Sequence, residues 1–299
     1  MLCRMIEKGA GLAAVRGDVA GSACTTFTIG GPLACLAEPQ DVEQLCRLLR
    51  FLSAEKLPYR ILGNGSNLLV NDAGVAECVI RLGKGFRYCR EAGTGLFESG
   101  GGTSLMSLSR ELSEQGIAGL EFAGGIPGSL GGAVCMNAGA HGGEMAQLLQ
   151  EVEWVSADGE QVTTPASCLA FAYRHSELPA GAVVTRMQLK LAASDAAICR
   201  ERRAHFLAER KARQPLTASS AGSVFRNPSP DRSAGYLIEQ AGLKGRQLGG
   251  AAVSTLHANW IINPDRQASA RDVLGLIGVC QEEVKAKFGV LLKPEVVLW

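Results

Sequence analysis

The chain has 299 residues, of which 46% are hydrophobic and 20% charged. These values are typical of a globular protein with two domains or so, and they exclude long disordered segments. With 30 Lys and Arg against 29 Asp and Glu, the formal net charge is +1, which leaves no basic excess for tracking a nucleic-acid backbone.

The cysteines and histidines carry no sign of a metal site. The ten cysteines include no CxxC pair, and the four histidines add no ligand spacing. We expect free, mostly buried thiols in a reducing compartment. The first eight residues carry charges where a signal peptide is apolar, and no apolar run reaches the length of a membrane span. The sequence therefore predicts a cytoplasmic protein without metal, membrane or nucleic-acid partners, and we expect a monomer.

The periodicity predicts an α+β protein in two parts that meet near residue 195. In the first part we expect a strand at 33–38 and a helix at 41–56 that begins with a capping box of Asp41 and Gln44. The other expected elements of this part are strands at 60–62, 68–70, 78–82, 86–91, 152–156 and 183–191 and a helix at 104–115. The second part is predicted to contain helices at 197–213, 234–241 and 269–288, and strands at 250–253, 260–262 and 294–298. The last helix is predicted to begin with a capping box of Ser269 and Asp272 and to stop at Gly289.

A dinucleotide fold of the Rossmann type is not indicated. The only match to its fingerprint, Gly9 to Ala14, is preceded by eight residues without a strand pattern. No GxxxxGK[ST] motif occurs either.

Two other glycine-rich segments are candidate phosphate loops. The first consists of Gly63, Asn64, Gly65, Ser66 and Asn67. Its glycines allow successive N–H groups to converge on an anion, although a tight turn explains this segment equally well. The second consists of Gly124, Gly125, Ile126, Pro127, Gly128, Ser129, Gly132 and Ala133, and continues to Asn137 and Gly139. A glycine loop that enters a short helix offers free amides to a phosphate, so two such loops suit a dinucleotide diphosphate.

Polar residues outside the glycine loops are candidates for catalysis. Arg174 follows Tyr173, Ser223 follows a glycine, Asn227 precedes a proline, and Glu295 lies near the chain end. Taken singly, each has a simple structural explanation as a surface charge or a turn residue.

These segments together resemble one family. The motifs from 26–32 through 63–67, 124–139, 173–176, 222–228, 237–245 and 253–259 are similar, in order, to those of UDP-N-acetylenolpyruvoylglucosamine reductases (UDP-N-acetylmuramate dehydrogenases). The resemblance implies non-covalent FAD in a vanillyl-alcohol-oxidase (PCMH) type domain at 25–193, whose N-terminal βαβ part is about 25–62. It also implies a smaller α+β substrate domain at 197–290 and a C-terminal strand, 291–299, that returns to the active site. The chain resembles the short form without the tyrosine loop.

The same resemblance implies a reaction and roles for particular residues. The enzyme would use NADPH and FAD to reduce UDP-N-acetylglucosamine enolpyruvate to UDP-N-acetylmuramate for peptidoglycan, and so serve cell shape and division. Hydride from reduced FAD would reach C3 of the enolpyruvyl group, and Ser223 would give a proton to C2 while Arg174 and Glu295 polarise the substrate. The residues implied to bind substrate are Tyr173, Arg210, Arg213, Asn227 and His257.

Two alternatives stay open. An FAD-dependent oxidase of a sugar or alcohol could use the same fold, but the segment 222–228 follows the reductase pattern. A flavin-binding module without catalysis is disfavoured because Arg174, Ser223 and Glu295 are all present.

Overall fold

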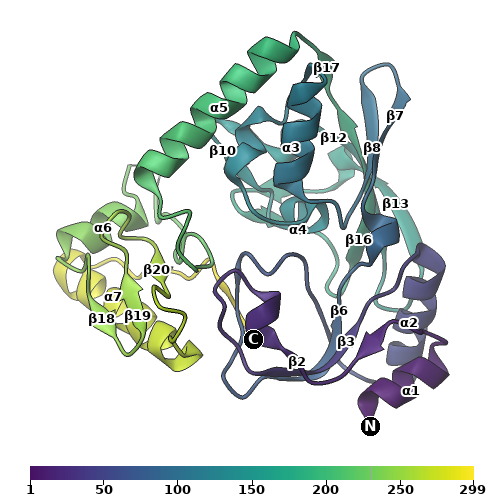
Figure 1. Ribbon diagram of the computed structural model, residues 1–299, viewed down its shortest axis with the longest axis horizontal. Coiled ribbons are helices and arrows are strands. Elements are labelled where there is room, and N and C mark those ends of the chain that lie inside the picture. The colour runs from purple at the N-terminus through teal and green to yellow at the C-terminus, as the bar shows by residue number, and fades with distance from the viewer. Residues whose placement is uncertain (230) are drawn as a thin grey trace. The chain divides into compact units, whose positions relative to one another are not determined.

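The computed structural model describes residues 1–229 and 231–299, and the chain divides into two compact units (Figure 1). The first unit comprises Met1–Gly17, Ala34–Asn64 and Ala76–Glu209, and the second Asp18–Leu33, Gly65–Val75 and Arg210–Trp299. Two segments from the first quarter of the chain therefore fold with the C-terminal third. Within the described residues, no helix is long and apolar enough to cross a membrane.

The N-terminal layer of the first unit is a sheet packed against two helices. The strands follow the order β1-β3-β6-β4, and β4 and β6 are parallel. β2 pairs with the first residues of β3, Pro32 and Leu33, and this pairing lies within the second unit. The bounds are β1 Val15–Arg16, β2 Val19–Ala20, β3 Pro32–Ala37, β4 Tyr59–Ile61, β6 Val75–Ile80, α1 Leu2–Gly9 and α2 Val42–Ala54. Asp41 caps α2 by accepting a hydrogen bond from the Gln44 amide at 2.8 Å, as the sequence predicts. Leucines at 45, 48, 49 and 52 are buried on the inner face of α2.

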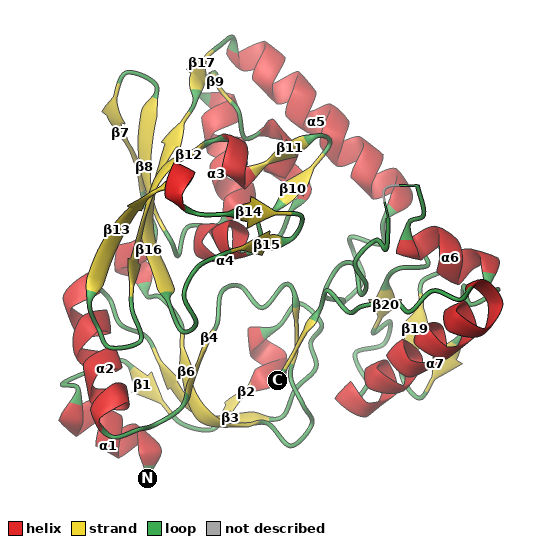
Figure 2. Ribbon diagram, turned by 180° about the vertical axis from the view of Figure 1, so that it is seen from behind, coloured by secondary structure: helices red, strands yellow, loops and turns green. Residues whose placement is uncertain are grey.

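A second, antiparallel sheet forms the centre of the first unit (Figure 2). Its strands, in spatial order, are β13 Gln161–Pro165, β12 Leu149–Val155, β16 Val183–Lys190, β8 Leu96–Gly100 and β7 Cys89–Gly93. Two helices, α3 at Leu105–Glu114 and α4 at Leu130–Cys135, complete the core on one face, where Met187 and Leu189 of β16 are buried. Ser104 caps α3 by accepting from the Ser107 amide.

A row of ion pairs connects neighbouring strands of this second sheet. Arg186 of β16 lies 2.8 Å from Glu98 of β8 and 3.1 and 3.4 Å from Glu151 and Glu153 of β12. Burial raises the pKa of the Glu98 carboxyl, but hydrogen bonds from Arg90 and Arg186 outweigh it, and the net pKa is lowered. The arginine therefore holds three strands through charge-assisted hydrogen bonds.

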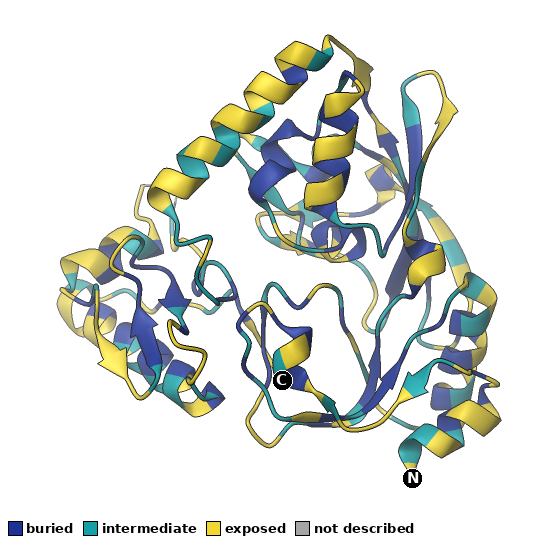
Figure 3. Ribbon diagram, in the orientation of Figure 1, coloured by how far each residue is buried: buried dark blue, intermediate teal, exposed yellow. Residues whose placement is uncertain are grey.

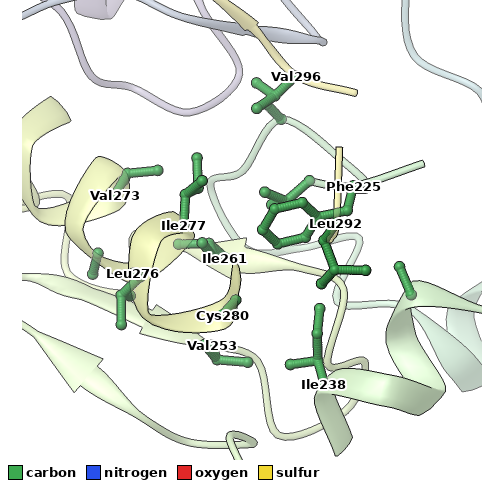
Figure 4. Close-up of a cluster of buried hydrophobic side chains, with 14 of the residues drawn as sticks. Phe225, Ile238, Val253, Ile261, Val273, Leu276, Ile277, Cys280, Leu292 and Val296 are labelled. Carbon is green, nitrogen blue, oxygen red and sulfur yellow. The ribbon is translucent and has the colours of Figure 1, made fainter. Parts of the chain in front are cut away.

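The second unit has a small sheet with two helices and one further strand pair. The strand order is β18-β19-β20, at Gln247–Leu248, Ala251–Val253 and Ile261–Ile262, with α6 at Ala234–Gln240 and α7 at Ala270–Phe288. Side chains from both helices, from the sheet and from the C-terminal segment meet in one apolar core (Figure 4). Ser269 and Asp272 form the predicted capping box of α7, and Gly289 ends the helix in a left-handed conformation.

The remaining elements are short, apart from one long helix. Three strand pairs are β9 Ile117–Ala118 with β17 Ala192–Ala193, β10 Gly139–Ala140 with β11 Gly143–Glu144, and β14 Phe171–Ala172 with β15 His175–Ser176. Single-turn 3₁₀ helices occur at Gly21–Cys24, Lys84–Phe86, Glu121–Gly125, Met145–Gln147 and Ala166–Cys168. The long helix α5, Ala196–Arg213, connects the two units along the chain.

The observed elements differ from the predicted ones at several places. The helix α1, the strands β8 and β13 and most of the two-residue strands were not predicted. The strand expected at 86–91 begins three residues later, at Cys89, because a 3₁₀ turn occupies Lys84–Phe86. The expected C-terminal strand is reduced to β21, Val297–Leu298, which pairs in parallel with β5, Leu68–Leu69.

The compact units also divide the chain differently from the predicted contiguous domain at 25–193. Asp18–Leu33 and Gly65–Val75 belong to the second unit. Long-range bonds explain this: β21 pairs with β5, and the buried Asn263 donates a hydrogen bond to the Phe27 carbonyl at 3.1 Å. The domain boundaries given by the resemblance stay a prediction.

Candidate active site

The two predicted phosphate loops adjoin each other in the first unit. A Cβ atom added to Gly63 would lie 2.7 Å from the Ser129 hydroxyl, so only glycine allows this approach. Ser129 is buried and caps α4 by accepting from the Gly132 amide at 3.3 Å. Because α4 has six residues, the backbone amides of the loop, rather than a helix dipole, are what this segment offers a ligand.

A third glycine segment, which the sequence analysis did not single out, supports the second loop. The Gly131 amide donates to the Gly101 carbonyl at 2.8 Å, and the Leu130 amide donates to the Thr103 carbonyl at 2.8 Å. A Cβ atom on Gly101 would lie 2.1 Å from the Val184 carbonyl oxygen. Three consecutive glycines at 100–102 were the available sequence signal; Gly101 packs closely against β16, and Gly100 and Gly102 against the Phe86 backbone.

The boundary between the two compact units falls within the first loop. Gly63 and Asn64 belong to the first unit, and Gly65, Ser66 and Asn67 to the second. Gly65 has φ +64°, and its Cβ would lie 2.0 Å from the Cys24 carbonyl oxygen. In the second unit, the Asn67 side chain donates to the Glu295 carbonyl at 3.1 Å. The loop therefore contacts the segment that carries a predicted catalytic residue.

Arg174 lies in a strained two-residue turn of the first unit. Ala172 of β14 pairs with His175 of β15, so Tyr173 and Arg174 form the tip of the hairpin. Arg174 has φ +57°, a left-handed conformation that costs a non-glycine residue about 1–2 kcal/mol. Such strain is found where surrounding contacts fix a functional side chain.

Three hydrogen bonds attach this hairpin to the last residue of α4 and the segment that follows it. The Asn137 side chain donates to the Ala172 carbonyl at 3.2 Å, and the Ser176 hydroxyl donates to the Cys135 carbonyl at 3.0 Å. The Arg174 guanidinium donates to the Gly139 carbonyl at 3.1 Å. The oxygen of the Asn137 amide accepts from the Ala146 amide at 3.0 Å, and the residue is 1% exposed. Asn137 thus positions the hairpin through its side chain, and its contact with the cofactor stays a prediction.

Ser223 and Glu295 lie on adjoining segments of the second unit. The Glu295 amide donates to the carbonyl of Val224, the residue after Ser223, at 2.7 Å. Phe225 and Pro294 form a bridge one residue further along. Both predicted catalytic residues are partly buried, and they are placed by backbone pairing between segments far apart in sequence.

Asn259, which the sequence analysis did not assign to the site, fixes the segment after Ser223. Its side-chain oxygen accepts from the Phe225 amide at 3.0 Å, and its nitrogen donates to the Phe225 carbonyl at 2.8 Å. Its own carbonyl accepts from the Val224 amide at 2.9 Å. Asn259 is 4% exposed, so these bonds form away from water. It belongs to a quoted motif, but nothing local in the sequence indicates this partner.

His257 and Asn227 both lie near the first residues of α6. His257 Nδ1 accepts from the Asn259 amide at 3.2 Å, which assigns the proton of the neutral ring to Nε2. Burial, helped by the nearby Lys244 charge, lowers the pKa of His257. Asn227 accepts from the Ala234 amide at 3.0 Å. A neutral imidazole that carries its proton on Nε2 therefore lies beside Gly235, whose Cβ would approach its ring to 3.1 Å.

The other predicted substrate residues differ in exposure. Tyr173 is 53% exposed, and the Arg174 guanidinium carbon lies 5.1 Å from the centre of its ring. Arg210, in the last turn of α5, is partly buried, whereas Arg213 is exposed.

Comparison with known proteins points to a single family. The family model described as the UDP-N-acetylenolpyruvoylglucosamine reductase C-terminal domain matches residues 214–299, and the FAD binding domain model matches residues 32–165. The chain is 45% identical to UDP-N-acetylenolpyruvoylglucosamine reductase 2 of Symbiobacterium thermophilum, over 92% of this chain and 89% of the relative. It is 43% identical to the Myxococcus xanthus reductase, over 91% and 88%.

A solved structure is similar over nearly the whole chain. The crystal structure of UDP-N-acetylenolpyruvylglucosamine reductase from Thermus caldophilus matches with a TM-score of 0.83 and 41% identity, covering 95% of this chain and 99% of that one. This confirms the predicted fold class, an FAD-binding domain followed by a smaller α+β domain.

Proposed function

The chain belongs to the UDP-N-acetylenolpyruvoylglucosamine reductase family, and from this premise we propose how its own residues perform the reaction. The enzyme is an FAD-dependent oxidoreductase of peptidoglycan precursor synthesis that uses NADPH. Its substrate is UDP-N-acetylglucosamine enolpyruvate. The observation that carries the residue assignment is the backbone pairing that puts Ser223 beside Glu295 in one unit.

The residues present fit FAD. At Gly63 and Gly65, neighbouring atoms occupy the space that a Cβ would need, which leaves bare backbone along the first loop. The second loop supplies Gly124, Gly125 and Gly128. Convergent backbone N–H groups of this kind bind phosphate oxygens, so these loops would hold the cofactor diphosphate. The chemistry that bound FAD would supply is hydride transfer, from NADPH to C3 of the enolpyruvyl group.

Arg174 binds the carboxylate of the enolpyruvyl group in this proposal. Its strained turn and its bond to the Gly139 carbonyl fix the guanidinium before substrate arrives. A fixed cation stabilises the charge that builds at C2 beside the carboxylate more effectively than one that must reorganise.

Ser223 donates the proton to C2, and Glu295 assists the polarisation of the substrate. Val224 and Phe225 are held on both sides, by Asn259 and by the 294–296 segment, so the Ser223 backbone has little freedom. General-acid catalysis requires this precision, and it contributes about 10²–10⁴-fold to rate.

Substrate contacts are proposed for Tyr173, Arg210, Arg213, Asn227 and His257. His257 offers its Nε2 donor, while Arg210 and Arg213 carry positive charge toward a nucleoside diphosphate. We also propose that the enzyme acts as a monomer in the cytoplasm, where NADPH and nucleotide sugars are available. Sedimentation analysis tests the monomer.

The test compares half-reactions of Ser223→Ala with those of the wild type without oxygen. We expect NADPH to reduce the flavin at the normal rate and reoxidation by the enolpyruvyl substrate to slow at least ~10²-fold. Unchanged reoxidation would remove Ser223 from the mechanism. Wild-type flavin that NADPH reduces but this substrate leaves reduced would count against the reductase. In a separate assay in air, oxidation of an alcohol with reduction of O₂ to hydrogen peroxide would favour an oxidase instead.

A further inference from the structure

One face of α5 points inward within the first unit. Cys199 is buried, and Arg203 and Phe206, four and seven residues later, are partly buried, whereas most other residues of the helix are exposed (Figure 3). The spacing follows the helical repeat. Phe206 stacks on the His141 ring with centroids 4.4 Å apart, and His141 Nδ1 lies 3.3 Å from Glu209. The helix is thus fixed against the segment that follows α4.

Arg203 lies directly over the start of the second glycine loop. A Cβ atom at Gly124 would be 2.8 Å from Arg203 Cγ, 3.1 Å from Nε and 3.4 Å from Cδ. Glycine is therefore required at position 124 by this arginine. The aliphatic part of the Arg203 side chain lies over Gly124, and the Nε atom of its guanidinium lies beside this first residue of the loop.

The Nε–H group of Arg203 is buried and has no hydrogen-bond acceptor among residues 1–229 and 231–299. No carboxylate in this described part of the chain forms an ion pair with it. Two carboxylates of the same region have other partners. Glu121 accepts from the Gly119 amide at 2.7 Å and lies 3.9 Å from Arg202, and Glu209 faces His141 and His205. A buried donor without a partner is unfavourable, and a ligand on the loop would supply the missing acceptor.

We propose that Arg203 is an additional cofactor-binding residue, whose Nε–H donates to a diphosphate oxygen of FAD held by the second glycine loop. This inference rests on the FAD site proposed above. The diphosphate is the anionic group that this loop suits, and a guanidinium gives it both charge and a directed hydrogen bond. Arg203 would add a positive charge that the backbone amides of the loop do not have. FAD affinity should therefore depend on this side chain and on ionic strength.

The experiment measures the dissociation constant of FAD from apoprotein by the quenching of flavin fluorescence. Arg203→Met keeps the apolar stem over Gly124 and removes the donors, and Arg203→Lys keeps the charge without the Nε–H. The matched control is Arg200→Met, which removes the same charge from an exposed position one turn earlier on α5. The melting temperature of each apoprotein reports folding.

We expect Arg203→Met to weaken FAD binding at least ~10-fold relative to Arg200→Met, with a smaller dependence of the dissociation constant on salt. Arg203→Lys should fall between them, and it provides the comparison if the methionine variant does not fold. The flavin midpoint potential should stay unchanged, because the contact is to the diphosphate. Equal affinities of Arg203→Met and Arg200→Met, or a shifted potential, would overturn the proposal. Wild-type protein that binds no FAD would instead refute the cofactor site itself.

Discussion

Replacing Asn259 by alanine should destabilise the second unit and slow proton transfer, because the same two hydrogen bonds support the fold and position the segment after Ser223. The substitution removes both side-chain bonds to Phe225, at 3.0 and 2.8 Å. Phe225 is 1% exposed, so water does not replace the lost partners. Each buried polar group left without a partner costs about 1–3 kcal/mol, and the two groups together predict a loss of about 2–6 kcal/mol in the free energy of unfolding.

Urea denaturation followed by tryptophan fluorescence measures this loss, because Trp260 lies next to Asn259 in the same unit. Gln240→Ala, an exposed change at the end of α6, is the control and should alter stability by no more than ~0.5 kcal/mol. The variant should also slow flavin reoxidation by the enolpyruvyl substrate while leaving reduction by NADPH unchanged, since Asn259 positions the segment after Ser223.

Two results would refute this reasoning. A loss of stability no larger than that of Gln240→Ala would mean that the bonds to Phe225 contribute little. Normal reoxidation in a clearly destabilised variant would mean that the Ser223 segment is positioned by the 294–296 pairing alone.

Three further changes test other parts of the structure. Gly65→Ala should lower stability by at least ~2 kcal/mol more than Gly142→Ala, because both have positive φ but only Gly65 has a backbone oxygen in the way; thermal denaturation compares them, and equal losses would contradict the steric account. Arg186→Met should lower the free energy of unfolding by roughly 2–4 kcal/mol, after allowance for its 23% side-chain exposure. The exposed Arg47→Met should lower it by no more than ~0.5 kcal/mol, and urea denaturation measures both. The pKa of His257 is lowered in the folded state, so the unfolded chain binds its proton more readily and stability should fall as the pH drops below 6.5. His257→Gln should weaken that decline between pH 7.5 and 5.5, and an identical decline would assign it to other groups.

Features that depend on neighbouring residues were predictable from the sequence. The caps of α2 and α7 form as expected, because Asp41 and Ser269 act on amides three residues away and Gly289 adopts its left-handed conformation locally. The order of the glycine-rich and polar motifs also indicated the family and its FAD. The strand β8 was missed because its sequence, Leu-Phe-Glu-Ser-Gly, shows no strict alternation.

Partners far apart in the chain were decided by the tertiary structure alone. Asn259 bonds to Phe225 across 34 residues, and Arg203 covers Gly124 from a different element. The left-handed backbone of Arg174 is known only from the three-dimensional structure, in which hydrogen bonds to Asn137 and Cys135 hold its hairpin in place.

The sequence by itself thus determined the helices other than α1, the caps of α2 and α7, the glycine loops and the family. The tertiary structure decided that Asp18–Leu33 and Gly65–Val75 fold with the C-terminal third, and which side chains hold Ser223, Glu295 and Arg174 in place. The physical reason is that capping and periodicity act over a few residues, whereas strand pairing and buried hydrogen bonds are satisfied by whichever distant groups the packed core brings within reach.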